Sequence, residues 1–323
     1  MSRTFSPRQA GIADVGPPGW FSTAHVVLRH VGAVAALVLF PLNRDLLLLV
    51  VVSYLLRIWG MEAVYHRYFS HRSYKTSRVF QFLLALVGVQ SGQRGPLWWA
   101  YVHRVHHRHA DMPADRHSPV AHGFARAYFG WMRQPDFRRM DWRVVADFAR
   151  YPELRWLTRF YEVPLELVGA LLALAGYLGW LGPNISGASA FLWGYCVPLV
   201  LVLHATAFVN TFCHLSRVPG GYQRYARERH SVNRPVLSFL MLGAGYHNNH
   251  HRMASLARAG FAWHEPDVTL WTLRLLRTLR LVDGVRDTVP DAVLREGGIG
   301  AGRRALRADA VERGPTARDE HAS

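Results

Sequence analysis

The stretch DLLLLVVVSYLLRIWGMEAVYHRYFSH, residues 45–71, joins a long apolar run to two histidines. Its first part, Asp45–Ile58, is apolar up to Arg57, and the pattern predicts a helix that continues to His66. Because a helix needs about 20 mainly apolar residues to cross a bilayer, we predict that this segment spans a membrane. His66 and His71 then stand where the chain leaves the membrane.

Three further apolar runs predict an all-α, integral membrane protein with about four transmembrane helices in total: Val26–Leu42, Val163–Leu181 and Ala188–Phe212. The connections after the first and third spans are short, so the four spans form two hairpins. The connection 72–162 then lies on the side where both hairpins begin and end, and its many arginines predict that this side is cytoplasmic. Within it, Val79–Val89 is apolar for only eleven residues, which indicates a buried or interfacial helix.

Both ends of the chain differ from this apolar part. Residues 1–20 are polar, contain Pro and Gly, and lack the apolar region of a cleavable secretory leader. Residues 285–323 are rich in Arg, Gly, Ala and Asp without apolar periodicity, which predicts a mobile C-terminal tail. The predicted organisation is therefore one membrane domain with its helical cap, residues 21–284, between two polar tails.

Charge and cysteine content limit the class of protein. Half of the 323 residues are hydrophobic, yet the formal net charge is +16. A basic protein could bind nucleic acid, anionic lipid or an acidic protein. Nucleic acid is disfavoured because the arginines flank apolar spans and form no stripe or known motif. Cys196 and Cys213 both lie in apolar sequence, so they provide neither a CxxC ligand pair nor a disulfide framework.

Two further groups of histidines, His103-x2-His106-His107 and His247-x2-His250-His251, lie in sequence outside the spans. On a helix, residues i, i+3 and i+4 share one face, so each group would present three imidazoles side by side. Imidazole binds Fe, Zn and Cu, whereas a structural zinc site needs only four ligands. The histidine groups therefore predict a transition-metal site at the membrane face, within reach of an apolar chain that rises from the bilayer.

Four stretches resemble the membrane-bound fatty acid desaturases of the stearoyl-CoA Δ9-desaturase type, especially their bacterial branch: HRYFSHRSYKTSRVFQF (66–82), GPLWWAYVHRVHHRHAD (95–111), HSP (117–119) and GYHNNHH (245–251). The resemblance covers about residues 25–275 and keeps the order and spacing of the histidine boxes. It implies two iron ions held by histidines and by a water that is bound to an asparagine. At the matching positions stand Asn210, for the water, and the nine histidines His66, His71, His103, His106, His107, His214, His247, His250 and His251.

The resemblance also implies a reaction. With O₂ as co-substrate, two hydrogens are removed from adjacent methylenes of a saturated acyl chain, which leaves a cis double bond at a Δ9-like position. The acyl chain could be carried by CoA, by a carrier protein or by a lipid. The bend of the substrate tunnel would be shaped by Gln93, Trp99 and Thr206. Carboxylates that orient the ligand imidazoles have candidates in Asp111, Asp115 and Glu228.

Electrons for this reaction must come from outside the chain. The sequence contains no flavin or nicotinamide fingerprint, no haem domain and no set of iron–sulfur cysteines. We therefore expect a ferredoxin or a cytochrome b5-like donor with its reductase, attracted to a basic cytoplasmic face. The expected location is a bacterial-type cell membrane. Zinc could replace iron in an overexpressed sample.

Several alternatives stay open. Val105, Ala244 and Arg116 depart from the family pattern; none is a ligand position, but they leave the substrate and the position of the double bond open. A hydroxylase or an acetylenase would share the same ligands. A membrane metal transporter or a haem protein would place its ionisable or paired histidine groups in mid-membrane, whereas these histidines concentrate at span ends and in polar sequence. A nucleic-acid-binding protein ranks last, because it leaves the boxes unexplained.

Overall fold

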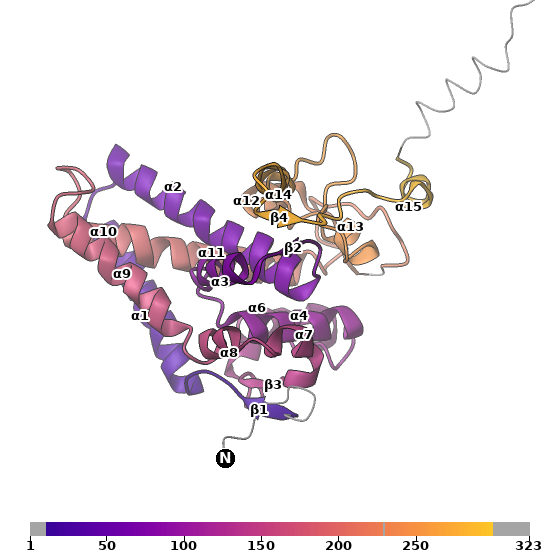
Figure 1. Cartoon of the computed structure of the whole chain (residues 1–323), viewed down its shortest axis with the longest axis horizontal. Helices are drawn as coiled ribbons and strands as arrows, with labels where there is room; N and C mark the ends of the chain where they lie inside the picture. Colours follow the sequence, from indigo (N-terminus) through magenta and orange to yellow (C-terminus); the bar gives the residue numbers. More distant parts are fainter. Residues whose placement is uncertain (1–10, 229, 300–323) are drawn as a thin grey trace, which may run out of the picture.

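The computed structural model describes residues 11–228 and 230–299, and these form a mainly helical protein (Figure 1). The longest helices in it are α1 (Gly19–Leu39), α2 (Arg44–Trp59), α9 (Glu162–Tyr177) and α11 (Val197–Phe212). Two π-helices continue long helices: η1 (Gly60–Ser70) follows α2, and η4 (Leu192–Cys196) joins α10 (Gly187–Phe191) to α11. In Figure 1, α1, α2, α9 and α10 extend toward the left, and most of the shorter elements gather at the right.

Three helices in the described part of the chain are long and apolar enough to cross a membrane: Gly19–Leu39, Arg44–Ser70 and Gly187–Phe212. A fourth span results if α8 (Pro152–Arg159) and α9, which meet at a bend of 68°, cross together. The predicted helical class is therefore confirmed, with three helices suited to crossing a membrane. The span predicted at Val163–Leu181 differs in extent, since α9 has only 16 residues and needs α8 to approach the thickness of a bilayer.

The outward faces of these helices carry apolar side chains. Leu28, Leu37 and Val38 of α1 are more than half exposed, as are Leu48 and Val52 of α2. An exposed apolar surface of this extent is typical of contact with lipid or with another protein. The exposure is what a helix in a bilayer requires, because lipid takes the place of a packing partner.

We call the elements from β2 to α8, together with those from α12 onward, the cap. The predicted helix Val79–Val89 is confirmed in the cap as α3, which packs against η1. In chain order the cap elements not yet given are β2 (Lys75–Thr76), α3 (Arg78–Val89), α4 (Pro96–His109), α5 (Pro119–His122), α6 (Phe124–Tyr128), η2 (Gly130–Arg133), β3 (Arg139–Asp141), η3 (Trp142–Val145), α7 (Ala146–Ala149), α12 (Pro235–Leu240), α13 (His247–Arg252), α14 (Val268–Thr278), β4 (Val282–Asp283) and α15 (Asp291–Glu296).

Short strands join distant parts of the chain. The all-α prediction did not contain these strands. β1 (Ile12–Asp14) pairs with β3, and β2 pairs with β4, both antiparallel. β1 lies in the N-terminal segment predicted to be a tail, and α15, which buries Val293, lies in the C-terminal one. Parts of both segments thus belong to the folded structure, and residues 1–10 and 300–323 lie outside the described residues.

Gly60 stands at the junction of α2 and η1, where this long helix approaches α3 closely. A Cβ atom at this position would lie 2.5 Å from the backbone carbonyl oxygen of Val87. A backbone atom cannot rotate away as the end of a flexible side chain can. A side chain at position 60 would therefore force the two helices apart, and glycine permits the contact.

We expect Gly60→Ala to lower the free energy of unfolding by about 1–3 kcal/mol, because overpacking displaces neighbouring backbone. The thermal midpoint of the purified protein in detergent measures this. Gly19→Ala is the matched control, since that residue is also helical and a Cβ there would meet nothing within 4 Å. Equal midpoints for the two variants would contradict the close approach of η1 and α3.

Candidate metal centre

The structure brings nine histidines together in two clusters. Within each cluster, one ligand nitrogen from every member lies within 4.8 Å of all the others. The first cluster consists of His66, His71, His103, His107 and His250. The second cluster consists of His106, His214, His247 and His251. All nine histidines singled out from the sequence therefore converge, although they come from η1, α4, α13 and the residues just after η1 and α11.

Each HxxHH box is divided between the two clusters, which the sequence did not predict. In α4, the outer pair of histidines belongs to the first cluster and His106 to the second. In α13 the assignment is reversed, with His250 in the first cluster and the outer pair in the second. Residues i and i+4 lie on one line along a helix and i+3 lies beside it. A helix placed between two sites can therefore supply both.

The ring nitrogens are spaced as ligands around metal ions would be. In the first cluster, neighbouring Nε2 atoms lie 2.8–3.0 Å apart in the order His66, His250, His107, His103 and His71. In the second cluster they lie 2.9–3.3 Å apart in the order His106, His251, His247 and His214. Two imidazoles bound at right angles, each about 2.1 Å from a metal, have nitrogens about 3.0 Å apart. The spacing fits one metal ion in each cluster.

The π-helix η1 explains why His66 and His71 share a cluster. In an α-helix of 3.6 residues per turn, positions five apart point about 140° away from each other. In a π-helix each N–H bonds to the carbonyl five residues back, so positions i, i+4 and i+5 lie on nearly the same side. The rings of His66 and His71, at the end of η1, accordingly lie 5.0 Å apart.

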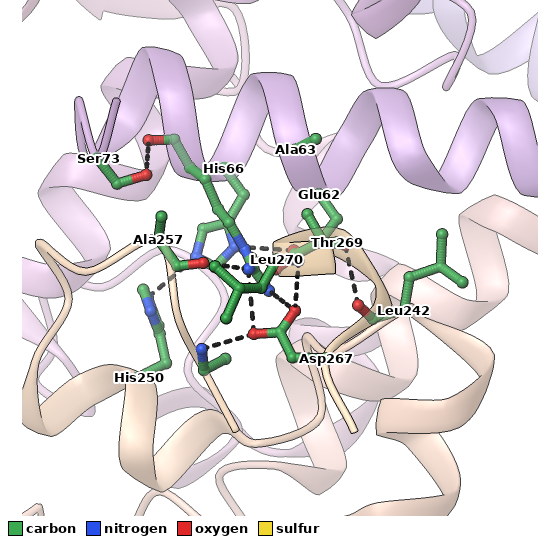
Figure 2. Close-up of polar contacts among 12 residues, drawn as sticks. Glu62, Ala63, His66, Ser73, Leu242, His250, Ala257, Asp267, Thr269 and Leu270 are labelled. Atoms are coloured by element: carbon green, nitrogen blue, oxygen red, sulfur yellow. Dashed lines mark hydrogen bonds and ion pairs between the residues drawn. The ribbon is translucent and has the colours of Figure 1, made fainter. Parts of the chain in front are cut away.

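The same geometry lets the buried Glu62 hold two neighbours. The Nδ1–H of His66 donates to Glu62 Oε2 at 2.8 Å, and the Nε–H of Arg67 donates to Oε1 at 3.1 Å. Arg67 also pairs with Asp267 at 2.9 Å. Figure 2 shows Glu62 and His66 on the helix, with Asp267 below them and His250 on the facing segment. Sequence reasoning missed Glu62, although its place four residues before His66 made it a helical neighbour.

Two more carboxylates hold imidazoles of the second cluster. The Nδ1–H of His106 donates to Asp115 at 2.8 Å, and that of His214 donates to Asp111 at 3.0 Å. A histidine whose Nδ1 carries the proton presents the lone pair of Nε2, and in both residues Nε2 faces the cluster. The contacts thus fit the role predicted for these two aspartates. Glu228 differs: it lines a pocket together with His251, but its carboxylate bonds to no clustered histidine in the described structure.

Burial favours the neutral form of six of the clustered imidazoles. Desolvation lowers the pKa well below its usual value, and neighbouring imidazoles lower it further, in His71, His103, His107, His247, His250 and His251. Burial alone would raise the pKa of Asp111, but its interactions with His214, Ser118 and His106 together outweigh burial and hold this pKa below its usual value. Neutral imidazoles and ionised carboxylates are the protonation states that metal binding requires.

A mostly apolar cavity of about 190 Å³ runs beside the clusters. Its wall contains all three residues predicted for the tunnel, Gln93, Trp99 and Thr206, together with His103 and Asn210. Gln93 Nε2 donates to Thr206 Oγ1 at 3.2 Å, and Trp99 stacks on His103 with ring centres 4.9 Å apart. A smaller cavity of about 30 Å³ is lined by Asn210 and by histidines of both clusters. An apolar chain in the larger cavity would pass next to the first cluster.

Other polar residues of the apolar sequence lie apart from the clusters. His204, within α11, has its Nε2 3.2 Å from that of His30, and its Nδ1 2.8 Å from the Tyr128 hydroxyl. Both cysteines, Cys196 and Cys213, are buried and free, as the sequence predicted. These polar groups are satisfied by neighbours or enclosed, so they add nothing to the donor set of the two clusters.

Comparisons with known proteins agree with this site. A family model described as fatty acid desaturase matches residues 45–265, which include all nine clustered histidines. An sn-1 stearoyl-lipid 9-desaturase of Anabaena variabilis is 32% identical over 274 residues, covering 83% of this chain and 93% of that protein. An sn-2 palmitoyl-lipid 9-desaturase of Nostoc sp. (strain 36) is 33% identical, covering 75% and 82%. An acyl-CoA 5-desaturase, AL21, of Anemone leveillei is 30% identical, covering 73% and 69%.

Proposed function

Because this chain belongs to the fatty acid desaturase family, we propose that its clustered histidines hold two iron ions and that it uses O₂ to form a cis double bond in a membrane lipid. The protein is a fatty acyl desaturase, and the proposal concerns its metal, its substrate carrier and the position of the double bond. The main support for this proposal is the pair of histidine clusters, of five and four members, beside an apolar cavity.

Iron fits the donor set. Imidazole binds several transition metals, but a structural zinc site is closed by four ligands, whereas the first cluster alone offers five nitrogens. Bound iron would supply the oxidising chemistry that acid and base side chains cannot supply against an unactivated C–H bond. The reaction consumes O₂, two hydrogens of the acyl chain, two electrons from a donor and two protons, and it yields one double bond and two waters.

The chain's own residues orient the substrate. Gln93 and Thr206 are joined by a hydrogen bond across the cavity wall, and Trp99 is held against His103. We propose that these three residues fix the bend of the acyl chain, so that one pair of methylenes lies beside the clusters. Asn210, which lines both cavities, would hold a water there. Such positioning decides which C–C bond reacts, since the methylenes of the chain are chemically alike.

A lipid-linked acyl chain and carbon 9 are the best-supported substrate and position. Two relatives that match three quarters or more of this chain are named as stearoyl-lipid or palmitoyl-lipid 9-desaturases. The Anemone relative, named as an acyl-CoA 5-desaturase, keeps CoA as the second candidate carrier. A lipid substrate would enter from the bilayer in which the apolar helices lie.

We further propose that the cap faces the cytoplasm of a bacterial-type cell. The arginine-rich connection 72–162 belongs mostly to the cap, and positive loops stay on the cytoplasmic side. Electrons would reach the cap from a soluble donor, a ferredoxin or a cytochrome b5-like protein with its reductase. Tagging each terminus and testing its access from either side of the membrane checks this orientation.

Expression of the full chain in a host that lacks unsaturated acyl chains tests the reaction. We expect a new cis double bond at carbon 9 of lipid-bound acyl chains, located by mass spectrometry, and two irons per purified chain. An added oxygen atom or a triple bond would replace the proposal by a hydroxylase or an acetylenase. One haem, or transported zinc without acyl modification, would replace it by a different class of protein.

Thr206→Leu is expected to lower kcat/KM for the acyl substrate about 10–100-fold, since misplaced reacting atoms cost rates of this order. The larger side chain would occupy the cavity and lose the bond from Gln93. Iron content should not change, because Thr206 belongs to neither cluster. Leu201→Ile, on the exposed surface of the same helix, is the control. Equal kcat/KM in the two variants would remove Thr206 from the tunnel.

A further inference from the structure

We propose that a basic pocket beside His71 is the docking site of a small acidic electron-donor protein. This inference rests on the proposed function, because it assigns a surface to the donor that the reaction needs. The pocket has a volume of about 560 Å³ and is formed by segments far apart in the chain: residues 68–81, 147–151, 255 and 284–286. It lies in the cap and at the end of η1.

The lining of this basic pocket is strongly cationic. One acidic residue, Asp147, stands in the wall among the described residues, and Arg104 already binds it at 2.8 Å. The cationic side chains are Arg72, Lys75, Arg78, Arg150 and Arg286. A concave surface lined by one sign of charge raises the local concentration of partners of the opposite sign. The pocket therefore favours an acidic surface.

Several of these cations are free to meet a partner. Arg78 is occupied by Glu153 at 2.7 Å. No ion pair within the described residues includes Lys75, Arg150 or Arg286, and all three side chains are exposed. Arg286 donates to the backbone oxygens of His71 and Arg72, at 2.8 and 2.7 Å, so its position is fixed against the end of η1. The charges of Lys75, Arg150 and Arg286 are thus not neutralised by any acidic side chain of the described residues.

His71 connects the basic pocket with the first histidine cluster. It lines the pocket, and its Nε2 lies 2.8 Å from that of His103. Because electron transfer weakens steeply with distance, a donor bound here would have a single side chain between it and the proposed iron. The pocket beside His251 differs in charge, because it combines Arg227 with Asp111 and Glu228.

The basic pocket is separate from the acyl cavity. The two share no lining residue, and the cations of the acyl cavity are Arg29, Arg94 and Arg133. A substrate whose acyl chain fills that cavity would therefore leave the basic pocket free. The separation suits a reaction in which acyl chain and electrons arrive at different faces of the same metal centre.

The test uses the full chain in lipid nanodiscs and a plant-type [2Fe–2S] ferredoxin as the probe. The double variant Lys75→Glu, Arg150→Glu reverses two free charges without touching the histidine clusters. We expect its Kd for ferredoxin to rise at least about tenfold at low salt, with a weaker dependence on ionic strength. Arg227→Glu, at the pocket beside His251, is the matched control and should leave the Kd unchanged. Single-turnover product formation with dithionite in place of ferredoxin should be equal in all three proteins.

Three other outcomes would overturn the inference. An unchanged ferredoxin Kd in the double variant, or an equal rise in Arg227→Glu, would remove the donor from this surface. A raised KM for the acyl substrate with an unchanged ferredoxin Kd would assign the pocket to a phosphate-bearing headgroup. If the protein without substitutions forms no product with dithionite, the proposed function is contradicted instead. The binding measurement needs no turnover, so failure of the docking inference and failure of the proposed function stay distinguishable.

Discussion

His103→Ala, His214→Ala and His250→Ala are each expected to abolish desaturation, with a loss of more than about 100-fold, and to lower the bound iron per chain. Losing a contact that merely supports a ligand already costs about 10–100-fold. His103 and His250 each have two cluster neighbours whose Nε2 atoms lie within 3.0 Å, and His214 has one. Iron analysis and product analysis on the purified variants measure both effects.

Membrane insertion should be intact in these three variants, because the clusters lie at the ends of the spans. His122→Ala is the control: this histidine belongs to neither cluster and bonds to the backbone oxygen of Pro113. We expect it to keep both iron and activity. Full turnover in His103→Ala, His214→Ala or His250→Ala would remove that residue from the ligand set.

Glu62→Gln is expected to lower iron affinity by about 10–100-fold, the usual cost of removing a partner that orients a metal ligand. Two donors face the carboxylate, the Nδ1–H of His66 and the Nε–H of Arg67. An amide of the same shape has one acceptor oxygen, so one donor would meet an NH₂ group. Competition with an iron chelator measures the affinity, separately from turnover.

The matched control for this effect is Glu153→Gln. Glu153 also binds an arginine through both oxygens, but its partner Arg78 is largely exposed. Surface ion pairs of this kind contribute about 0–1 kcal/mol, and Glu153 contacts no clustered histidine. Equal iron affinities in the two variants would show that Glu62 does not orient His66, and would leave it a purely structural role beside Arg67.

Spacing along the chain was enough to find the metal-binding candidates. The two HxxHH boxes stand out because their imidazoles recur at helical intervals, and His66 and His71 stand out because they follow an apolar run that locates the membrane. His214 and Asn210 are a different case: each is a single residue, and only the resemblance to a family selected them. The structure places His214 in the second cluster and Asn210 in the wall of both cavities.

Spacing could not assign Glu62 or the basic pocket. Glu62 lies four residues before His66, but its ion pair with Arg67, which in turn pairs with Asp267, is seen only in the structure. The cations of the pocket come from positions as distant as Lys75, Arg150 and Arg286. Their juxtaposition depends on the packing of the cap, and no local pattern of the sequence contains it.

The sequence by itself determined the helical class and the identity of eight of the nine clustered histidines, because hydrophobic runs and ligand spacing act over short stretches of chain. The tertiary structure alone decided which imidazole serves which cluster. α4 and α13 stand between the two clusters and divide their boxes in opposite ways, and η1 adopts a π-helix that turns His66 and His71 to one side. The division of the boxes and the orientation of His66 and His71 both depend on how helices pack against each other, because the position of whole helices fixes the direction of side chains around a metal.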